Sequence, residues 1–136
     1  MRTARLPLRG LTAAALATVA LAGCGTGESD RVRAKVEQFA AAAARDNYGE
    51  ICDQVLATPL LEQLAASGIS CESAMRTALG TVSQVTVGIG RITVSGAHAR
   101  VLTLSAARGQ RAVLAEIDLV QESGGWRISA LSRGGR

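Results

Sequence analysis

The spacing of apolar residues changes once along the chain, at Gly80, and this change restricts the fold more than any other feature of the sequence. Before Gly80, apolar residues recur every three or four positions, which is the period of an amphipathic helix. After Gly80 they alternate in steps of two, the period of a strand with one buried face. Helices followed by strands predict an α+β fold and argue against a doubly wound sheet, in which the two elements would alternate.

The first helix is predicted over residues 30–45. Ser29 or Asp30 is a suitable N-cap, and a polar segment containing a glycine follows residue 45. Apolar side chains recur along one side of this helix at spacings of three and four: Val32, Val36, Phe39, Ala40 and Ala43. We expect this side to face the core.

Three shorter helical segments follow before Gly80. The first covers residues 50–57, and the second begins at Thr58, a capping residue that precedes a proline suited to the first helical turn. Ser70 is the expected cap of the last segment, residues 71–79, which Gly80 ends. We expect these short segments to be the least regular part of the domain.

Four strands are expected after Gly80, over residues 85–94, 98–105, 111–121 and 126–131. Within the first strand the apolar positions change parity around Gly88 and Gly90, which indicates a bulge or a sharp bend. The connections between the strands are short. Short connections favour neighbouring antiparallel strands, so we expect a curved antiparallel meander with the helices packed on it.

The N-terminal segment has the order of a secretory signal. Arg2, Arg5 and Arg9 precede an uncharged run of 13 residues, and small residues then lead to Cys24. A helix needs about 20 apolar residues to cross a bilayer, so this run favours a removable signal over a permanent membrane span. Residues 21–24, with the sequence Leu-Ala-Gly-Cys, resemble the bacterial lipobox.

The lipobox resemblance implies cleavage between Gly23 and Cys24 and lipidation of the Cys24 thiol by a diacylglyceryl group, with fatty acyl chains such as palmitate. Two or more acyl chains anchor a protein stably, so the processed chain would be lipid-anchored on the extracytoplasmic face of the cell membrane. The alternative is an ordinary secreted protein with a chance cysteine. Residues 24–30 would be the lipidated cysteine and a short tether, which places the domain close to the membrane.

Cys52 and Cys71 remain once Cys24 carries lipid. In an exported chain two remaining thiols predict a disulfide, which would close a loop of about 20 residues and stabilise the fold by about 3 kcal/mol. We expect no metal site, because the single histidine, His98, is distant in the sequence and no CxxC pair occurs. No base lies close in sequence to support a catalytic thiol, and no cofactor is expected.

The charge balance argues against a nucleic-acid partner. Removing the three arginines of the signal from the 15 basic residues leaves 12, against 11 acidic residues. A nearly neutral domain without a cluster of lysines and arginines lacks the electrostatic footprint that phosphate binding requires.

Several features together carry a resemblance to a known family: the lipobox, a helix with V-x-x-F-x-x-A, the paired cysteines, the alternating strands and the closing G-G-W-R-I-S-x-L. This pattern resembles the small lipoproteins of high-GC Gram-positive bacteria in the nuclear transport factor 2-like (NTF2-like, ketosteroid-isomerase-like, cystatin-like) superfamily. The resemblance implies a curved sheet wrapped around helices as a cone, often with an apolar pocket, and a core position for Trp126. Function does not follow from the fold in this superfamily.

A catalytic site inside such a cone would need a carboxylate with a raised pKa and a hydrogen-bond donor. The candidates are Glu116, Asp118, His98, Arg100 and Tyr48. The two acids alternate with a more apolar face that should be directed at the core: Val113, Ala115, Ile117 and Leu119. We therefore expect Glu116 and Asp118 to be mainly exposed, His98 to lie on the surface and Tyr48 to serve in packing.

Two functional hypotheses follow. The first is a membrane-anchored extracytoplasmic lipoprotein whose domain binds a protein partner or a small apolar ligand without catalysis. The second is a small hydrolase or isomerase that uses the interior of the cone. We favour the first, because only three aromatic residues occur whereas enzymatic members have pockets rich in them. The predicted organisation is a signal peptide over residues 1–23, the lipidated tether over 24–30, one α+β domain over 31–132 and a frayed tail over 133–136.

Overall fold

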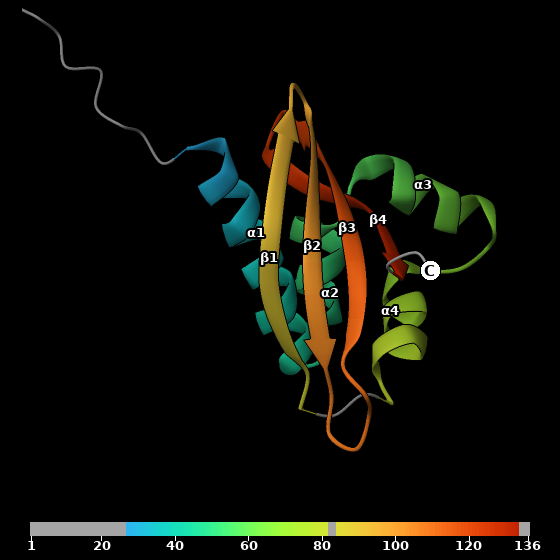
Figure 1. Ribbon diagram of the computed structural model, residues 1–136. Helices are drawn as coiled ribbons and strands as arrows, with labels where there is room; N and C mark the ends of the chain where they lie inside the picture. The colour runs from blue at the N-terminus through green and yellow to red at the C-terminus, as the bar shows by residue number, and fades with distance from the viewer. Residues whose placement is uncertain (1–26, 82–83, 134–136) are drawn as a thin grey trace, which may run out of the picture.

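The structure is a computed structural model that describes residues 27–81 and 84–133 (Figure 1). The helical elements come first and the strands follow: α1 (Glu28–Ala44), α2 (Tyr48–Glu50), the π-helical turn η1 (Ile51–Val55), α3 (Thr58–Ala66), α4 (Cys71–Leu79), β1 (Thr86–Ser95), β2 (His98–Ala106), β3 (Val113–Glu122) and β4 (Gly125–Arg133). This order confirms the predicted α+β fold. The predicted signal peptide, Gly23 and Cys24 lie outside the described residues.

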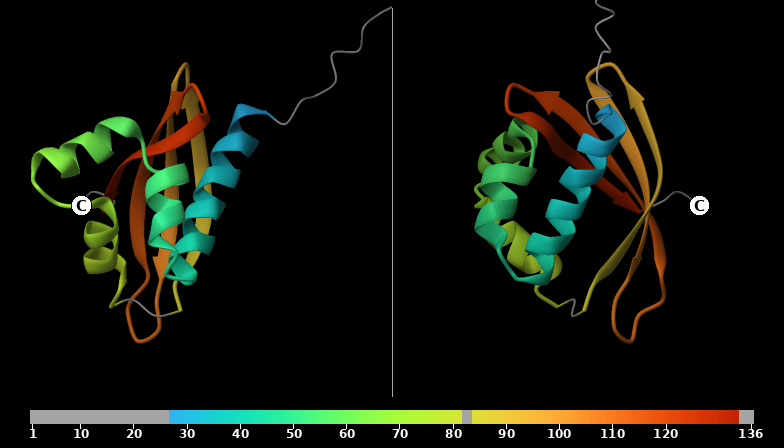
Figure 2. Two further views of the ribbon diagram at one scale, coloured as in Figure 1. Left: turned by 180° about the vertical axis from the view of Figure 1, so that it is seen from behind. Right: turned by 90° about the vertical axis from the view of Figure 1, so that its left-hand side faces the viewer.

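The four strands form one sheet in the order β1-β2-β3-β4, and each strand is antiparallel to the next, which confirms the predicted meander. The sheet is curved, and all the helices lie on one side of it (Figure 2). We call this side the inner face and the opposite side, which none of the helices described here covers, the outer face. The arrangement is the cone that the family resemblance implied.

Two irregularities shape the sheet. The β1–β2 register shifts between Ile89 and Ile92, so the bulge predicted from the change of parity lies at Gly90 and Arg91. A second shift, between Asp118 and Leu119 of β3, leaves Ser129 of β4 as the additional residue, and the sequence did not predict it. Bulges bend a strand and increase its twist, so these two positions contribute to the curvature of the sheet.

The core lies between α1 and the inner face of the sheet, where apolar side chains from both layers are fully buried: Val32, Val36, Ile51, Val55, Leu56, Val101, Leu119 and Ile128. Trp126 is 3% exposed, which confirms its predicted core position. Its indole Nε1 donates a hydrogen bond to Glu28 Oε2 at 2.7 Å, so the start of β4 is joined to the start of α1.

α1 differs from its prediction at its start and in one buried position. Gly27 is the N-cap, and the predicted caps Ser29 and Asp30 lie inside the first turn. The physical reason is the contact of Glu28 with Trp126, which holds the first turn in place without a side-chain cap. Ala42 is fully buried in place of the predicted Ala40 and Ala43, which are half-buried.

The second predicted helix consists of α2 and η1, which end at Val55 rather than at residue 57. Leu56 instead forms a parallel bridge with Ile128 of β4, and the Ala57 amide donates to the Ile128 carbonyl at 2.8 Å. The predicted Thr58 cap is wrong, because the N-cap of α3 is Ala57. The Thr58 amide and hydroxyl donate instead to the Glu122 carboxylate, at 2.8 and 3.1 Å, so a tertiary contact replaces the local one.

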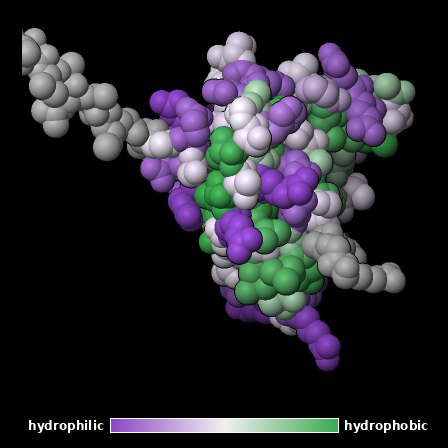
Figure 3. Space-filling view, turned by 45° about the horizontal axis from the view of Figure 1, so that its top comes forward, coloured by the Kyte–Doolittle hydropathy of each residue, from purple (hydrophilic) through white to green (hydrophobic). Residues whose placement is uncertain are grey.

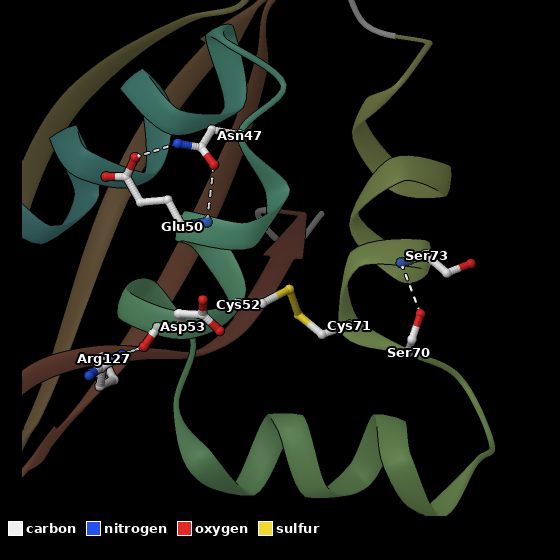
Figure 4. The surroundings of a disulfide bond; sticks show 8 residues. All are labelled: Asn47, Glu50, Cys52, Asp53, Ser70, Cys71, Ser73 and Arg127. Carbon is white, nitrogen blue, oxygen red and sulfur yellow. Dashed lines mark hydrogen bonds between the residues drawn. A yellow bond between two sulfur atoms is a disulfide. The ribbon is translucent and has the colours of Figure 1, made fainter.

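The disulfide between Cys52 and Cys71 is present, as predicted, with the two Cα atoms 5.9 Å apart. It joins η1 to the first residue of α4 (Figure 4). The predicted Ser70 cap is confirmed, because its hydroxyl accepts a hydrogen bond from the Ser73 amide at 3.3 Å. α3 and α4 contain no buried residue, so this disulfide joins them to a core in which they take little part.

Candidate functional site

Four of the five candidate residues lie on the outer face of the sheet, and three of them border one depression. His98, Arg100 and Asp118 border a shallow depression of about 480 Å³. Thr93, Ser95 and Ser129, which carry hydroxyl groups, and the apolar Ala99 and Leu119 also line it. His98 is exposed, as predicted, and pairs across the strands with Ser95 and Val120. The depression is open and bordered by charged and hydroxyl-bearing side chains, and it lies on the side of the sheet opposite the interior of the cone.

Arg100 forms an ion pair with each of the two candidate acids. Its Nε lies 3.0 Å from Glu116 Oε1 and 3.3 Å from Asp118 Oδ1. The acids point away from the core as predicted, but the expectation that they are mainly exposed is only partly right, since their side chains are 27% and 36% exposed. Arg100, on the neighbouring strand, covers part of both carboxylates and reduces their exposure to solvent. Such surface ion pairs contribute at most about 1 kcal/mol to stability, so their main effect is to hold the charges in place.

Tyr48 lies apart from the other candidates, on the helical side of the molecule. Its ring is 8% exposed, its hydroxyl donates to Asp46 Oδ1 at 2.9 Å, and the Arg76 guanidinium lies 5.9 Å from the ring centroid. The hydrogen bond to Asp46 raises the pKa of Tyr48 above its ordinary value, and desolvation adds to the effect. A buried phenol that retains its proton and contacts α4 serves in packing, as predicted.

A second, smaller cavity of about 180 Å³ lies inside the cone, between α1 and the inner face of the sheet. We call it the inner pocket. Its lining is mainly aliphatic and hydroxyl-bearing: Phe39, Val87, Thr103, Ser105, Ala115, Glu116, Ile117, Leu131 and Ser132. Two of the predicted inward residues, Ala115 and Ile117, line it, and Leu119 is buried elsewhere in the core.

The mouth of the inner pocket is apolar and faces away from the N-terminus. Leu131, in the lining of the inner pocket, is 47% exposed. Val113 lies on the inner face of β3 as predicted, opposite Ser105, but it is 44% exposed and does not take part in the core. The reason is that Val113 begins β3, where the cone opens. Phe39, which lines the inner pocket, lies 11 residues beyond Glu28. The pocket is therefore about 17 Å along α1 from the start of that helix. The chain enters at the other end of the sheet, beside the β1–β2 turn (Figure 1).

Thr103 is the one polar side chain of the inner pocket that is fully enclosed. It is 2% exposed, and its hydroxyl donates to the Ala115 carbonyl at 3.3 Å. Thr103 was not among the site residues predicted from the sequence, although the alternation of Val101, Thr103 and Ser105 in β2 indicated a common face. Because its proton is used within the sheet, Thr103 adds little polarity to the pocket.

Two cations hold the end of η1. Lys35 Nζ donates to the Gln54 carbonyl and Arg127 Nη1 donates to the Asp53 carbonyl, both at 2.9 Å (Figure 4 shows the second contact). Burial lowers the pKa of Lys35, nearby Arg127 lowers it further, and Glu50 opposes the change. The carbonyls at a helix end lack partners within the helix, so these contacts satisfy them. No sequence pattern relates Lys35 to residues 19 positions away.

Neither a metal centre nor a membrane span is found in the part of the chain that the structure describes. No three His, Cys, Asp or Glu side chains within residues 27–81 and 84–133 are grouped so that they could hold a metal ion. Across the same ranges, every helix is too short or too polar to traverse a bilayer.

No protein-family model matches the sequence, and no curated protein matches it. Three solved structures share its fold. A variant with five substitutions named Rd1NTF2_05 has a TM-score of 0.60 at 13% identity, over 79% of this chain and all of the other. A de novo designed protein with a curved β-sheet has a TM-score of 0.54 at 13% identity, over 76% of this chain and 99% of the other. The Kfla4162 protein from Kribbella flavida has a TM-score of 0.51 at 17% identity, over 76% of this chain and 86% of the other.

At these identities the comparisons concern the fold alone. The chain has the NTF2-like fold, in agreement with the resemblance found in the sequence.

Proposed function

We propose that the chain is a membrane-anchored extracytoplasmic lipoprotein whose domain binds a small apolar group in the inner pocket without catalysing a reaction. Support for the anchor comes from the sequence, in which three arginines, an apolar run and Leu-Ala-Gly-Cys follow one another. Support for the binding role comes from the lining of the inner pocket.

The aliphatic lining of the inner pocket is the observation that carries the binding role. An apolar cavity of about 150 Å³ in a protein core stays dry and takes up benzene. The inner pocket, at about 180 Å³, is suited to a short alkyl chain or a single ring. Phe39, Val87 and Ile117 would supply apolar contact, and the hydrophobic effect would drive binding.

The positions of the ionisable groups favour binding over catalysis. A general base must lie within hydrogen-bond reach of the proton that it removes. Glu116 borders the inner pocket, but its carboxylate pairs with Arg100. Asp118 also pairs with Arg100, and Tyr48 donates to Asp46. An apolar guest in the inner pocket would therefore contact no free acid or base among these candidates.

Methyl NMR of the processed protein tests the binding role, with benzene and octanoate as probes. We expect saturable shifts of the Val87, Ile117 and Leu131 methyl groups. Ala115→Leu should fill the inner pocket and abolish these shifts. Ala130→Leu, at a half-buried outer-face position of the neighbouring strand, is the matched control and should retain them. The absence of saturable shifts, or their persistence in Ala115→Leu, would contradict the proposal.

Two further measurements address the anchor and the enzyme alternative separately. Intact-mass analysis should find Cys24 as the acylated N-terminus, and Cys24→Ala should accumulate as an unprocessed precursor. An unmodified Cys24 would refute the anchor and leave the NMR result standing. Hydrolysis of p-nitrophenyl octanoate that disappears in Glu116→Gln would instead favour the enzyme.

A further inference from the structure

A cavity of about 330 Å³ lies between the first half of α1 and the β3–β4 turn. Arg31, Lys35 and Gln38 line it from α1, and Gln121 and Trp126 line it from the sheet. No acidic side chain of the described residues lines it, and it shares no lining residue with the inner pocket. We call it the basic cavity.

Arg127 of β4 adds a third positive charge to this cavity. A Cβ atom added at Gly124, which also lines the cavity, would lie 3.6 Å from Arg127 Nη2. Burial lowers the pKa of Lys35, and the charge of Arg127 lowers it further, as two cations in close proximity require. Arg127 is distant from Lys35 in the sequence, so this cluster of cations is formed by the fold alone.

Contacts with the protein hold Lys35 and Arg127 in place and leave N–H groups for a ligand. The ammonium of Lys35 has three donors, and Gln38 Oε1 and the Gln54 carbonyl accept two of them, at 2.7 and 2.9 Å. The guanidinium of Arg127 has five, and Nη1 donates one of them to the Asp53 carbonyl at 2.9 Å. A ligand would therefore meet donors whose positions are already fixed, which reduces the entropy lost on binding.

Glu28 and Glu50 lie near the basic cavity, since they accept hydrogen bonds from two of its lining side chains, but each already pairs with an arginine. Glu28 Oε1 lies 2.7 Å from Arg31 Nη1, and Glu50 Oε2 lies 3.1 Å from Arg45 Nη2. The other two cations of the cavity form no salt bridge with a described carboxylate. Their positive charges are therefore available to an anion.

We propose that the basic cavity binds the phosphate group of an anionic phospholipid, with Lys35 and Arg127 as its main partners and Arg31 beside them. Phosphate oxygens accept charge-assisted hydrogen bonds from ammonium and guanidinium groups, and these are about twice as strong as hydrogen bonds between neutral groups. Small-molecule sites have volumes of about 300–1,000 Å³. The basic cavity, at about 330 Å³, is at the lower end of that range, so it suits a headgroup rather than a whole lipid.

The place of the cavity in the fold favours a lipid over free phosphate, and this step rests on the proposed membrane anchor. Glu28 follows Cys24 by four residues, so the start of α1 lies within about 14 Å of the residue that would carry the lipid. Lys35 lies seven residues further, which is about 10 Å along α1. The β3–β4 turn lies at the same end of the molecule as the start of α1 (Figure 1 and Figure 2), and Figure 3 shows hydrophilic side chains around that start. A domain held at the membrane surface meets headgroup phosphates at a high effective concentration.

Lys35 is the only lysine of the chain, so incorporation of lysine labelled with ¹³C at Cε gives one NMR signal that reports its pKa. The processed protein is placed in nanodiscs of phosphatidylcholine, whose headgroup has no net charge, with or without phosphatidylglycerol. A bound anion favours the ammonium form, so we expect phosphatidylglycerol to raise the pKa of Lys35. Arg33→Lys adds a second lysine at an exposed position of α1 outside the cavity lining, and this lysine measures the general effect of a charged surface. The rise at Lys35 should be the larger of the two, and equal rises would contradict the proposal.

Substitutions around the cavity test whether the selective rise comes from a bound headgroup. Gly124→Leu should fill the cavity without changing the charge of the protein, and the selective rise should be lost. Gly124 has no positive φ and a Cβ there makes only ordinary contacts, so the turn can accept the substitution. Ser123→Leu, at the neighbouring exposed position of the same turn, is the matched control and should retain the rise.

Arg127→Gln tests the second main partner of the phosphate. In phosphatidylcholine alone it should raise the pKa of Lys35, because a nearby positive charge is removed. The further rise with phosphatidylglycerol should then be mostly lost, because a donor to the phosphate is missing. A selective rise that persists in both Gly124→Leu and Arg127→Gln would overturn the proposal.

Inorganic phosphate added to the phosphatidylcholine nanodiscs distinguishes the two sources of the anion. We expect no comparable rise, because free phosphate lacks the effective concentration that the membrane surface provides. A rise with millimolar phosphate equal to that with phosphatidylglycerol would assign the cavity to free phosphate and contradict the lipid. A selective rise in a chain whose Cys24 is unlipidated would refute the anchor alone, and a lipidated chain without a selective rise would refute the headgroup site alone.

Discussion

Two regions of this molecule are held together in different ways. Between α1 and the inner face of the sheet, residues such as Val36, Val101 and Ile128 are wholly removed from solvent. The lobe formed by α3 and α4 has no buried residue, and its leucines lie half-buried at the margin of the core. The disulfide from Cys52 to Cys71 joins the two regions.

The difference shows what each region can do. Close packing fixes the inner pocket, because Phe39 and Ile117 in its lining belong to the core. The lobe buries little apolar surface, so its position depends on a covalent bond and on half-buried apolar contacts at the margin of the core. We therefore expect the lobe to open locally at a lower free energy than the sheet, and the predictions below test that expectation.

The largest effect should come from truncating the core. Ile128→Ala removes a side chain that is 0% exposed, so the free energy of unfolding should fall toward the upper end of the range of about 2–5 kcal/mol. Leu64→Ala removes a similar amount of side chain from half-buried α3 and should cost about 1 kcal/mol. Urea denaturation measures both. Equal losses would mean that the lobe belongs to the core.

Removal of the disulfide should affect the lobe first. The variant Cys52→Ala/Cys71→Ala should lose about 3 kcal/mol by the chain-entropy model for a loop of this length. Hydrogen exchange should show faster exchange of the α3 and α4 amides while β2 and β3 remain protected. If the amides of all four elements exchange together, the two regions unfold as one unit and the contrast between them is wrong.

A smaller, local effect should follow from loss of the α4 cap. Ser70→Ala removes the hydroxyl that accepts the Ser73 amide and should cost about 1 kcal/mol. Ser73→Ala makes the same chemical change in the same helix without removing a cap, and it should be nearly neutral. Protection of the α4 amides measures the difference. If the two variants are equally protected, the cap does not contribute to holding the lobe.

The sequence predicted the features that depend on local residue patterns or on the number of cysteines available for a disulfide. The order of helices and strands, the meander, the bulge at Gly90 and the cap at Ser70 all followed from residue spacing. The disulfide followed from counting cysteines in a chain for which the sequence predicts an export signal. Each of these features is encoded within a few neighbouring residues or, for the disulfide, by one pair of cysteines. Predicting them therefore required no knowledge of tertiary contacts.

The features that the sequence did not predict depend on contacts between distant segments. Thr58 fails as a cap because Glu122, 64 positions away, takes its amide and hydroxyl. The half-buried state of Glu116 and Asp118 depends on Arg100 in the neighbouring strand. For the inner pocket, the sequence predicted the aliphatic face, but the exposure of Val113 depends on where the cone opens, which no periodicity gives.

The smallest effect concerns Tyr48, which lies where the lobe meets the rest of the molecule. Its hydrogen bond to Asp46 and its burial raise the pKa of Tyr48 in the folded state above the ordinary value of 10.0. Arg76 of α4 contacts the ring and acts in the opposite direction. The stabilisation from the raised pKa is therefore complete below pH 10 and is lost as the pH rises through the folded-state pKa, since the unfolded chain releases the proton more easily.

Tyr48 is the only tyrosine of the chain, so its tyrosinate absorbance reports this site alone. Spectrophotometric titration should give a pKa above 10.0, and Asp46→Asn should lower that pKa because the carboxylate acceptor is removed. Tyr48→Phe should abolish the titration and the associated loss of stability at high pH. Arg76→Ala should raise the pKa of Tyr48, because the positive charge beside the ring is removed. A pKa that does not respond to Asp46→Asn would contradict the assigned cause, and one that does not respond to Arg76→Ala would show that α4 has no electrostatic influence on the ring.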